Sequence, residues 1–172
     1  SIKAIIIVLV MVGMYIAYVF RKLAGNLSPW VLGVAAIVAL VHDILIPAGI
    51  FAALGHFRGV EISAVFVAAA LTILGFSLSD TVVIFDRVRE NAIKYGSKLS
   101  FPDTVHLSVK ETLVRSINTS LTTLLSLVAI YFFGGESVRY FSLALIIGIF
   151  LGAFSSLSIA TPILIWAAHR KK

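Results

Sequence analysis

The chain lacks cysteine and has few charged residues. With no cysteine among its 172 residues, disulfide bonds and thiolate metal sites are excluded. Charged residues make up only 13% of the sequence, against roughly 25% in a typical soluble domain. In their place, 60% of the residues are hydrophobic. A single water-soluble core of this size cannot hide so much apolar surface, so the composition indicates a membrane protein.

Five apolar segments approach the length needed to cross a bilayer, about 20 residues at a rise of about 1.5 Å each. They predict an all-α polytopic membrane bundle that forms a single domain over residues 1–172. Short connections are expected at 25–29, with Ser28 as a helix cap, at 55–59 and at 134–135. A polar loop is expected at 86–115, with a short helix starting near Pro102. The five spans are expected at residues 4–20, 30–54, 62–85, 116–133 and 140–168.

Positive charge is distributed unevenly about these spans, and the net charge is +6. The rule that positive loops stay inside places 86–115 and the C-terminus in the cytoplasm and the N-terminus outside. A chain that starts outside at Ser1 is expected to lack an N-terminal part. The charge is read as orientation and contact with anionic lipid, and not as a nucleic-acid surface. The inner side would hold Arg21, Lys22, Arg87, Arg89, Lys94, Lys98, Lys110, Arg115, Arg170, Lys171 and Lys172, against Lys3, Arg58 and Arg139 outside.

Asp80 is the most informative ionisable residue. It lies in the third expected span, roughly 7–8 Å of helical rise before the polar end. An aspartate in mid-membrane costs about 2.5–3.5 kcal/mol on insertion scales, and such residues usually mark ion or proton pathways. The position therefore predicts a proton carrier. The alternative is a side chain that reaches the interface or caps a neighbouring helix.

A polar stripe begins at Arg115, where the fourth expected span starts. Because arginine keeps its charge at working pH, the approach of Arg115 to Asp80 would hold that carboxyl group ionised. The alternative for Arg115 is an ordinary positive-inside anchor. Isolated serines and threonines usually bond to their own backbone, but a stripe that continues from an arginine favours a packed or hydrated path. The stripe consists of Thr119, Thr122 and Ser126, at steps of four, three and four residues from Arg115, and is widened by Asn118 and Thr123.

His42 and Asp43 form a second polar feature near the middle of the second expected span. One interpretation is a polar pair that braces helices. The other is a second element of a proton relay, because histidine titrates near neutral pH. Pro47 lacks an N–H group and would free the backbone carbonyl of Asp43 to join this cluster.

Small residues mark the last expected span. Gly148, Gly152, Ser156 and Ala160 recur at four-residue spacing. A face of small residues allows two helices to approach closely, so Gly148 and Gly152 are predicted to serve helix packing and not chemistry.

Several motifs resemble the SecF family of bacterial protein-export subunits. Residues 79–91 read SDTVVIFDRVREN and resemble the SecF signature, in which a membrane aspartate precedes an FDR(I/V)REN run. Residues 111–124 (ETLVRSINTSLTTL), residues 132–136 (FFGGE) and the His42-Asp43 pair also look like SecF. The sequence departs from the family pattern at Ser79, His106, Glu111 and Ser116. The signature residues are Phe85, Asp86, Arg87, Arg89, Glu90 and Asn91.

The resemblance implies a six-span SecF-type domain, of which this chain would hold the last five spans without the first helix and the periplasmic domain. It implies a multi-pass protein of the bacterial inner membrane that works with SecD and the SecYEG translocon on unfolded exported polypeptides. It also implies the membrane architecture of resistance–nodulation–division efflux pumps, with protons as the coupling ion, no other cofactor and no enzyme activity. By match to the family motifs, Asp80 would be the proton-responsive carboxylate, with Arg115 and Thr119 as its switching partners.

Three other functions remain open at the level of sequence. The chain could act as a structural scaffold of the translocon without a motor role, or belong to a SecD or efflux-type relative. An intramembrane aspartyl protease would need Asp43 and Asp80 to share a proton. Residues 77–80 (SLSD) lack the Gly-x-Gly-Asp form expected of such proteases, and no nucleophile–base or zinc motif is present.

Overall fold

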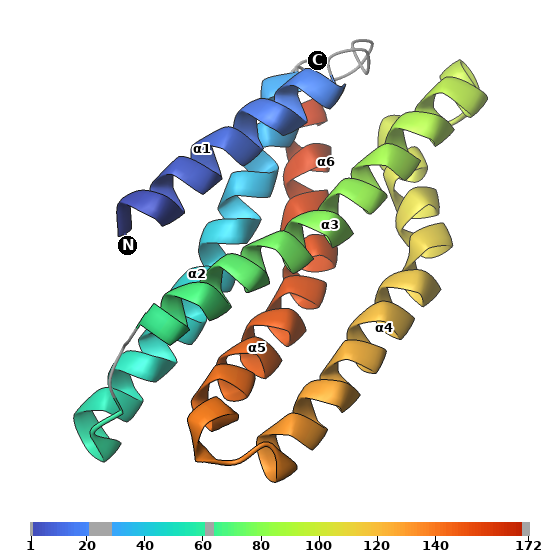
Figure 1. Ribbon diagram of the computed structural model, residues 1–172. Coiled ribbons are helices and arrows are strands. Elements are labelled where there is room, and N and C mark those ends of the chain that lie inside the picture. The colour runs from blue at the N-terminus through green and yellow to red at the C-terminus, as the bar shows by residue number, and fades with distance from the viewer. Residues whose placement is uncertain (1, 21–28, 61–63, 170–172) are drawn as a thin grey trace.

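The computed structural model describes residues 2–20, 29–60 and 64–169, and these are almost entirely helical. The helices form one tilted bundle (Figure 1). The predicted cap at Ser28 and the basic residues at 21–22 and 170–172 lie outside the described residues. In chain order the elements are α1 (Ile2–Val19), α2 (Pro29–Arg58), α3 (Ala64–Tyr95), a 3₁₀ turn (Gly96–Lys98), α4 (Phe101–Phe133), α5 (Glu136–Ser155), a π-helical segment (Ser156–Ala160) and α6 (Thr161–His169).

Four described stretches have the length and apolar composition to cross a membrane. The last of them joins α5, the π-helical segment and α6 into one rod. The apolar part of α1, Ile5–Val19, is shorter than these four. The predicted all-helical membrane bundle is therefore confirmed, whereas α1 as a fifth span stays a prediction. The four stretches are Trp30–Arg58, Ala64–Tyr95, Phe101–Phe133 and Glu136–Ala168.

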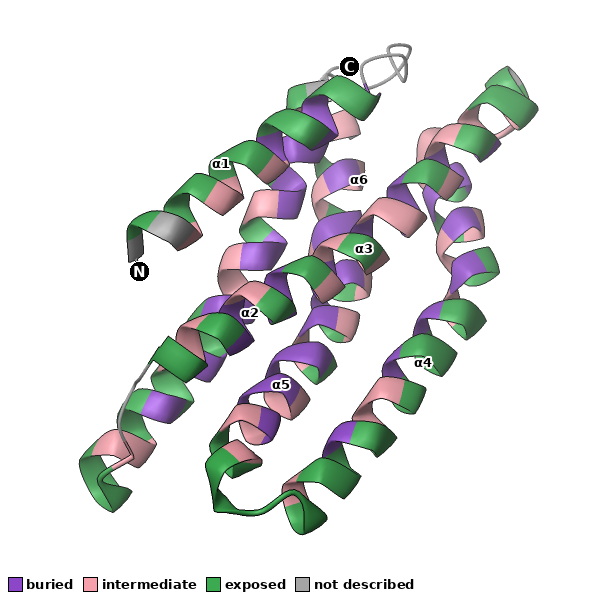
Figure 2. Cartoon of the chain, in the orientation of Figure 1, coloured by how far each residue is buried: buried purple, intermediate pink, exposed green. Residues whose placement is uncertain are grey.

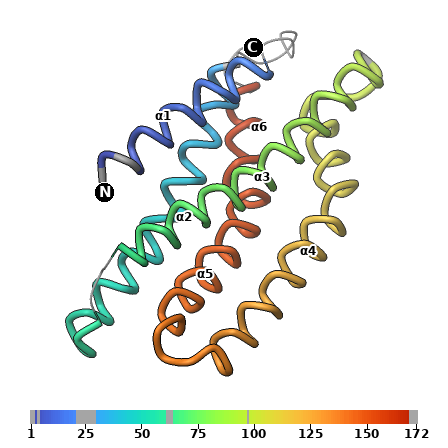
Figure 3. Tube along the Cα trace, in the orientation of Figure 1, coloured from blue at the N-terminus to red at the C-terminus, as the bar shows by residue number. Residues whose placement is uncertain are grey.

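Helix α5 is the central element of the bundle. It packs against α2, α3 and α4, whereas α1 packs chiefly along α2. The Cα trace shows α1 and α4 on opposite sides of the bundle (Figure 3). The α4–α5 connection is the tight turn predicted at 134–135, where Gly135 adopts a φ of +81° that favours glycine.

The polar segment 86–115 differs from the expected loop. Helix α3 continues to Tyr95 and α4 already begins at Phe101, so the connection is a short turn. Residues 86–95 contain neither glycine nor proline, and nothing but loss of hydrophobicity marked the expected end of this helix. Ser100 caps α4 by accepting a hydrogen bond from the backbone N–H of Asp103, and Pro102 occupies the first turn. Both helices therefore extend beyond their apolar parts.

Small residues bring α5 and α3 close together. Gly148 is buried, and a Cβ atom added there would collide with the side chain of Ile73 on α3. A Cβ atom added at Gly152 would lie 2.9 Å from the Cβ of Ser77. Larger residues at either position would force the two helices apart, so these glycines lie where close helix packing requires them.

Candidate functional site

Asp43 lies at the polar centre of the bundle, where α2, α3 and α5 meet. Its side chain is completely buried. One carboxylate oxygen accepts hydrogen bonds from the Ser77 hydroxyl of α3 at 2.5 Å and from the Ser155 hydroxyl of α5 at 2.7 Å. The other oxygen lies 3.0 Å from Nδ1 of His42. A buried charge must be compensated by such bonds, so Asp43 is the point at which three helices are joined by polar contacts.

Asp80 has a more open environment. It is half-buried, and the Ser116 hydroxyl of α4 donates a hydrogen bond to its Oδ1 at 2.5 Å. Its buried Oδ2 has no partner among the described residues. Arg115 directly precedes Ser116 on α4, but the described side chains of Arg115 and Asp80 form no ion pair within 4.0 Å. One oxygen of Asp80 therefore remains able to accept a further hydrogen bond.

A third polar contact connects the surroundings of these two carboxyl groups. Thr81 of α3 lies next to Asp80, and its hydroxyl is 2.9 Å from the hydroxyl of Ser156. Ser156 is the first residue of the π-helical segment and directly follows Ser155, which binds Asp43. Single π-helical turns inside α-helices occur frequently at functional sites. Hydroxyl and carboxyl groups thus form a polar layer across α2, α3, α4 and the end of α5.

Helix α4 carries two polar stripes. The stripe predicted from the sequence is exposed, and a different stripe is buried. In the predicted stripe each hydroxyl donates to the backbone carbonyl four residues earlier, and Thr119, Thr122 and Ser126 are exposed. Asn118 and Arg115 are exposed as well. The buried stripe recurs every four residues and faces the bundle, with members Thr104, Ser108, Thr112, Ser116 and Ser120.

The hydroxyl group that binds Asp80 is that of Ser116, and the role of Thr119 as a switching partner stays a prediction. Thr119 gives its hydroxyl hydrogen bond to the carbonyl of Arg115, and Ser116 occupies the place beside the carboxyl group. Successive residues on an α-helix are about 100° apart, so Ser116 lies on the face that meets α3 while Arg115 lies beside that face. The sequence signal that was missed is the run of serines and threonines at steps of four, to which Ser116 belongs.

The first part of the signature segment packs and pairs along α3. Phe85 is buried, and its ring makes an edge-to-face contact with Phe20, with the ring centroids 6.1 Å apart. Asp86 and Arg89 form an ion pair at 2.6 Å within the helix, and both are substantially exposed. The Asp86–Arg89 ion pair therefore stabilises the part of α3 beyond Phe85, where the sequence pattern predicted a loop.

The second part of the signature joins α3 to α4. Arg87 binds Glu90 on its own helix at 2.5 Å and Glu111 on α4 at 2.7 Å. Asn91 is buried and donates hydrogen bonds to Ser108 at 3.0 Å and to Glu111 at 2.7 Å. Glu111, one of the positions where the sequence departs from the family pattern, thus receives hydrogen bonds from two signature residues. These contacts fix how α4 lies against α3.

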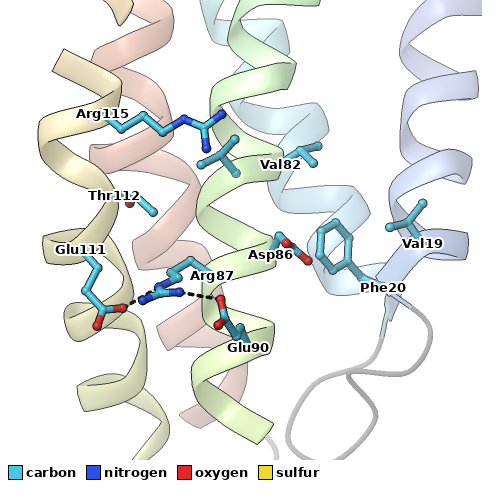
Figure 4. A pocket seen from close by; sticks show the side chains of 10 residues that line it. Val19, Phe20, Val82, Asp86, Arg87, Glu90, Glu111, Thr112 and Arg115 are labelled. Carbon is cyan, nitrogen blue, oxygen red and sulfur yellow. Dashed lines mark hydrogen bonds and ion pairs between the residues drawn. The ribbon is translucent and has the colours of Figure 1, made fainter. Parts of the chain in front are cut away.

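A pocket of about 470 Å³ lies between the end of α1 and the facing parts of α3 and α4 (Figure 4). Its wall combines the Arg87–Glu111 pair with apolar side chains such as Phe20 and Val82, and Arg115 lines it above the pair. Because Arg115 precedes Ser116, the polar partner of Asp80, the pocket reaches to within one residue of that partner.

The two carboxyl groups do not form a shared dyad. Asp43 binds residues of α3 and α5, whereas Asp80 binds a residue of α4, and no hydrogen bond joins the two described carboxyl groups.

A helical bundle with four membrane-length rods and hydrogen-bonded carboxyl groups between them defines a polytopic membrane protein with ionisable residues of the kind found in transport pathways.

Comparison with known proteins identifies the family. A family model described as "Protein export membrane protein SecD/SecF, C-terminal" matches residues 1–170. The chain belongs to this family of protein-export membrane proteins. The resemblance to SecF inferred from the signature segment is thereby confirmed.

Relatives and one solved structure agree with this family. "Protein translocase subunit SecF" of Thermobaculum terrenum is 50% identical over 152 residues, which cover 88% of this chain and 46% of the relative. "Protein translocase subunit SecDF" of Thermus thermophilus is 39% identical over 170 residues, 99% of this chain and 22% of the relative. A crystal structure of SecDF in a super-membrane-facing form matches with a TM-score of 0.84 and 38% identity, over 99% of this chain and 22% of that one. The chain thus spans less than half the length of these relatives.

Proposed function

We propose that this chain is the membrane part of a SecF-type protein-translocase subunit that uses proton movement through Asp80 to assist protein export. It acts in the bacterial inner membrane together with SecD and the SecYEG translocon, and its substrates are unfolded exported polypeptides. Names of relatives, "Protein translocase subunit SecF" and "SecDF", support the translocase role. It is a transport subunit without enzyme activity, and protons are its coupling ion.

The observation that carries the proposal is the environment of the Asp80 carboxyl group. One oxygen is held by Ser116 of a neighbouring helix, and the other has no protein partner among the described residues. Arg115 directly precedes Ser116 on α4, and the described side chains of Arg115 and Asp80 form no ion pair within 4.0 Å. A carboxyl group in this environment can exchange a proton, and a movement of Arg115 relative to α3 alters the stability of its charged form.

A route for protons is supported by the pocket between α1, α3 and α4. Its charged wall can hold water, and Arg115 lies at its inner part. The basic residues of α3 and α4 gather at this end of the bundle, which supports a cytoplasmic location for it by the positive-inside rule. The pocket then connects cytoplasmic water with the level of Asp80.

Proton flow supplies limited energy per step. One charge that crosses 100 mV releases about 2.3 kcal/mol. A large movement of an attached domain therefore requires several protons per cycle, delivered one after another to the same carboxyl group.

The test uses the full-length subunit with its SecD partner in inner-membrane vesicles. Asp80→Asn should abolish the stimulation of export by a proton gradient, because the amide cannot take up and release the proton, while the protein still inserts. Export of a labelled precursor is measured with and without the gradient. Glu136→Gln is the control, because Glu136 is an exposed carboxyl group at the start of α5, away from the polar layer.

Two results would count against the proposal. Undiminished stimulation in well-inserted Asp80→Asn vesicles would remove the proton-coupling role. Full export by that variant, together with normal recovery of SecD and SecYEG in pull-downs, would favour the scaffold function instead.

A further inference from the structure

Asp43 is more deeply buried than Asp80 and has more partners. Its side chain has no exposed surface, and three groups from three helices approach its two oxygens: Ser77, Ser155 and the His42 ring. The Asp80 carboxyl group, which the proposed function uses, has one hydrogen-bond partner among the described residues. A bundle that needed only a brace at Asp43 could use a neutral side chain there, since burying a carboxylate is costly even when it is bonded.

The contact between His42 and Asp43 is suited to sharing a proton. The 3.0 Å distance between Nδ1 and Oδ1 is a hydrogen bond in either of two states. A protonated Nδ1 donates to the carboxylate, or a protonated carboxyl group donates to an unprotonated Nδ1. The same positions of the heavy atoms therefore serve both states, and a proton can be gained or lost without breaking this contact.

The His42 ring connects this pair with the outside of the bundle. The His42 side chain is 28% exposed, whereas the Asp43 side chain is fully buried. A proton on the imidazole Nδ1 is therefore one transfer away from the carboxyl group.

Few other titratable groups surround the pair. On α3 the nearest along the helix is Asp80, three residues after Ser77 and bonded to Ser116. Helix α5 offers Ser155 and carries Glu136 and Arg139 in its first turn, at the opposite end. Helix α1 presents apolar side chains at the neighbouring level, among them Ile5, Val8 and Leu9 packed near Ile44. Among the described residues, no other titratable group shares a hydrogen bond with the pair.

The two carboxyl groups are linked through adjacent residues. On α3, Ser77 binds Asp43, and Thr81 directly follows Asp80. On the facing helix, Ser155 binds Asp43. The next residue, Ser156 of the π-helical segment, binds Thr81. Loss of charge at Asp43 weakens the bonds from Ser77 and Ser155, because hydrogen bonds to a charged acceptor are the stronger ones. The contact between α3 and the π-helical segment then changes next to Asp80.

We propose that His42 and Asp43 form a second proton-binding site, whose occupancy adjusts the contact between α3 and the π-helical segment beside Asp80. The proposal builds on the proton-driven function proposed above. Asp43 is the group that holds the proton, and His42 is the group through which it enters and leaves.

The experiment is an infrared titration of the full-length protein with its SecD partner in lipid nanodiscs, with 13C-labelled aspartate to mark carboxyl bands. Protonation of each buried aspartate adds a C=O stretching band of the carboxylic acid. We expect Asp43→Asn to remove one titrating band and Asp80→Asn to remove a different one. His42→Gln should shift the titration midpoint of the Asp43 band and leave the Asp80 band in place.

A second variant keeps the test decisive if Asp43→Asn does not fold. Ser155→Ala retains both aspartates and removes one hydrogen bond to the Asp43 carboxylate, so it should alter the same band. Absence of any band that responds to either Asp43→Asn, His42→Gln or Ser155→Ala would overturn the second site.

The outcomes separate this inference from the proposed function. If Asp80→Asn loses gradient-stimulated export and no titrating band belongs to Asp43, only the second site is rejected. If the Asp43 band titrates but the Asp80→Asn variant exports normally, the proton-driven role of Asp80 is rejected. The proton-binding site at His42 and Asp43 is then retained.

Discussion

Helices α4 and α5 form one hairpin but relate to the bundle in opposite ways. Along α5 the small residues Gly148 and Gly152 are buried against α3, and the hydroxyl of Ser155 reaches a carboxyl group of another helix. Along the membrane half of α4 the hydroxyls of Thr122 and Ser126 return to their own backbone and the side chains are exposed. Burial colours show the same contrast, with α5 mostly buried or intermediate and the lower half of α4 mostly exposed (Figure 2).

The contrast shows that a hydroxyl group in a membrane helix has two possible uses. On α5 and α3 hydroxyls connect helices and surround carboxyl groups, so their loss should affect the fold or the site. On the outer face of α4 each hydroxyl group donates its hydrogen bond to a backbone carbonyl of the same helix. Three substitutions test this comparison, from the largest expected effect to the smallest.

Gly148→Leu should have the largest effect, because an added side chain would collide with Ile73 of α3. Overpacking of a tight core costs about 1–3 kcal/mol or more, and here it also separates the helices that hold the polar layer. Thermal unfolding of the purified protein in detergent should show a clear drop in Tm. Gly75→Leu is the matched control, because a Cβ atom there meets nothing within 4 Å. Equal Tm values for the two variants would show that α5 does not depend on this close contact.

Thr81→Val should have an intermediate effect. The substitution preserves the shape of the side chain and removes the hydroxyl that pairs with Ser156 of the π-helical segment. Hydrogen bonds between membrane helices are worth about 0.6 kcal/mol on average and up to about 1.7 kcal/mol, so the free energy of unfolding should fall within that range. Stability is measured by unfolding in mixed micelles. A change near zero would mean that the contact between α3 and the π-helical segment contributes no stability.

Thr122→Val should have the smallest effect on the isolated chain. The hydroxyl of Thr122 donates only to the backbone carbonyl of Asn118, and the side chain is exposed. A surface substitution of this kind usually changes stability by less than about 0.5 kcal/mol. The same micelle assay applies. A loss of stability as large as that of Thr81→Val would contradict the distinction between hydroxyl groups that connect helices and those that bond to their own backbone.

The main features of the fold were predictable from the sequence because lipid imposes simple rules. A continuous apolar run must be helical in a membrane, and glycine at 134–135 marked the hairpin correctly. The segment 86–115 was expected to be a loop, because hydropathy reports where a helix leaves the membrane and not where it ends. Its helical continuation depends on ion pairs such as Asp86–Arg89 and on the Ser100 cap.

The candidate site was predictable only in part. Asp80 and the His42–Asp43 pair were recognisable, because ionisable residues in apolar segments are rare and costly. Ser116, Ser77 and Ser155 were not identified, because a serine in a membrane helix carries little information until its rotation about the helix axis is known.

The sequence by itself determined that this protein is a helical membrane protein, which segments are apolar and which charges need an explanation, because the cost of placing a group in lipid depends on the chain alone. The tertiary structure decided which hydroxyl groups meet those charges. A step of one residue turns a side chain by about 100°, so only the packing of α2, α3, α4 and α5 determines that Ser116 faces Asp80 and that Asp43 lies at the centre of three helices.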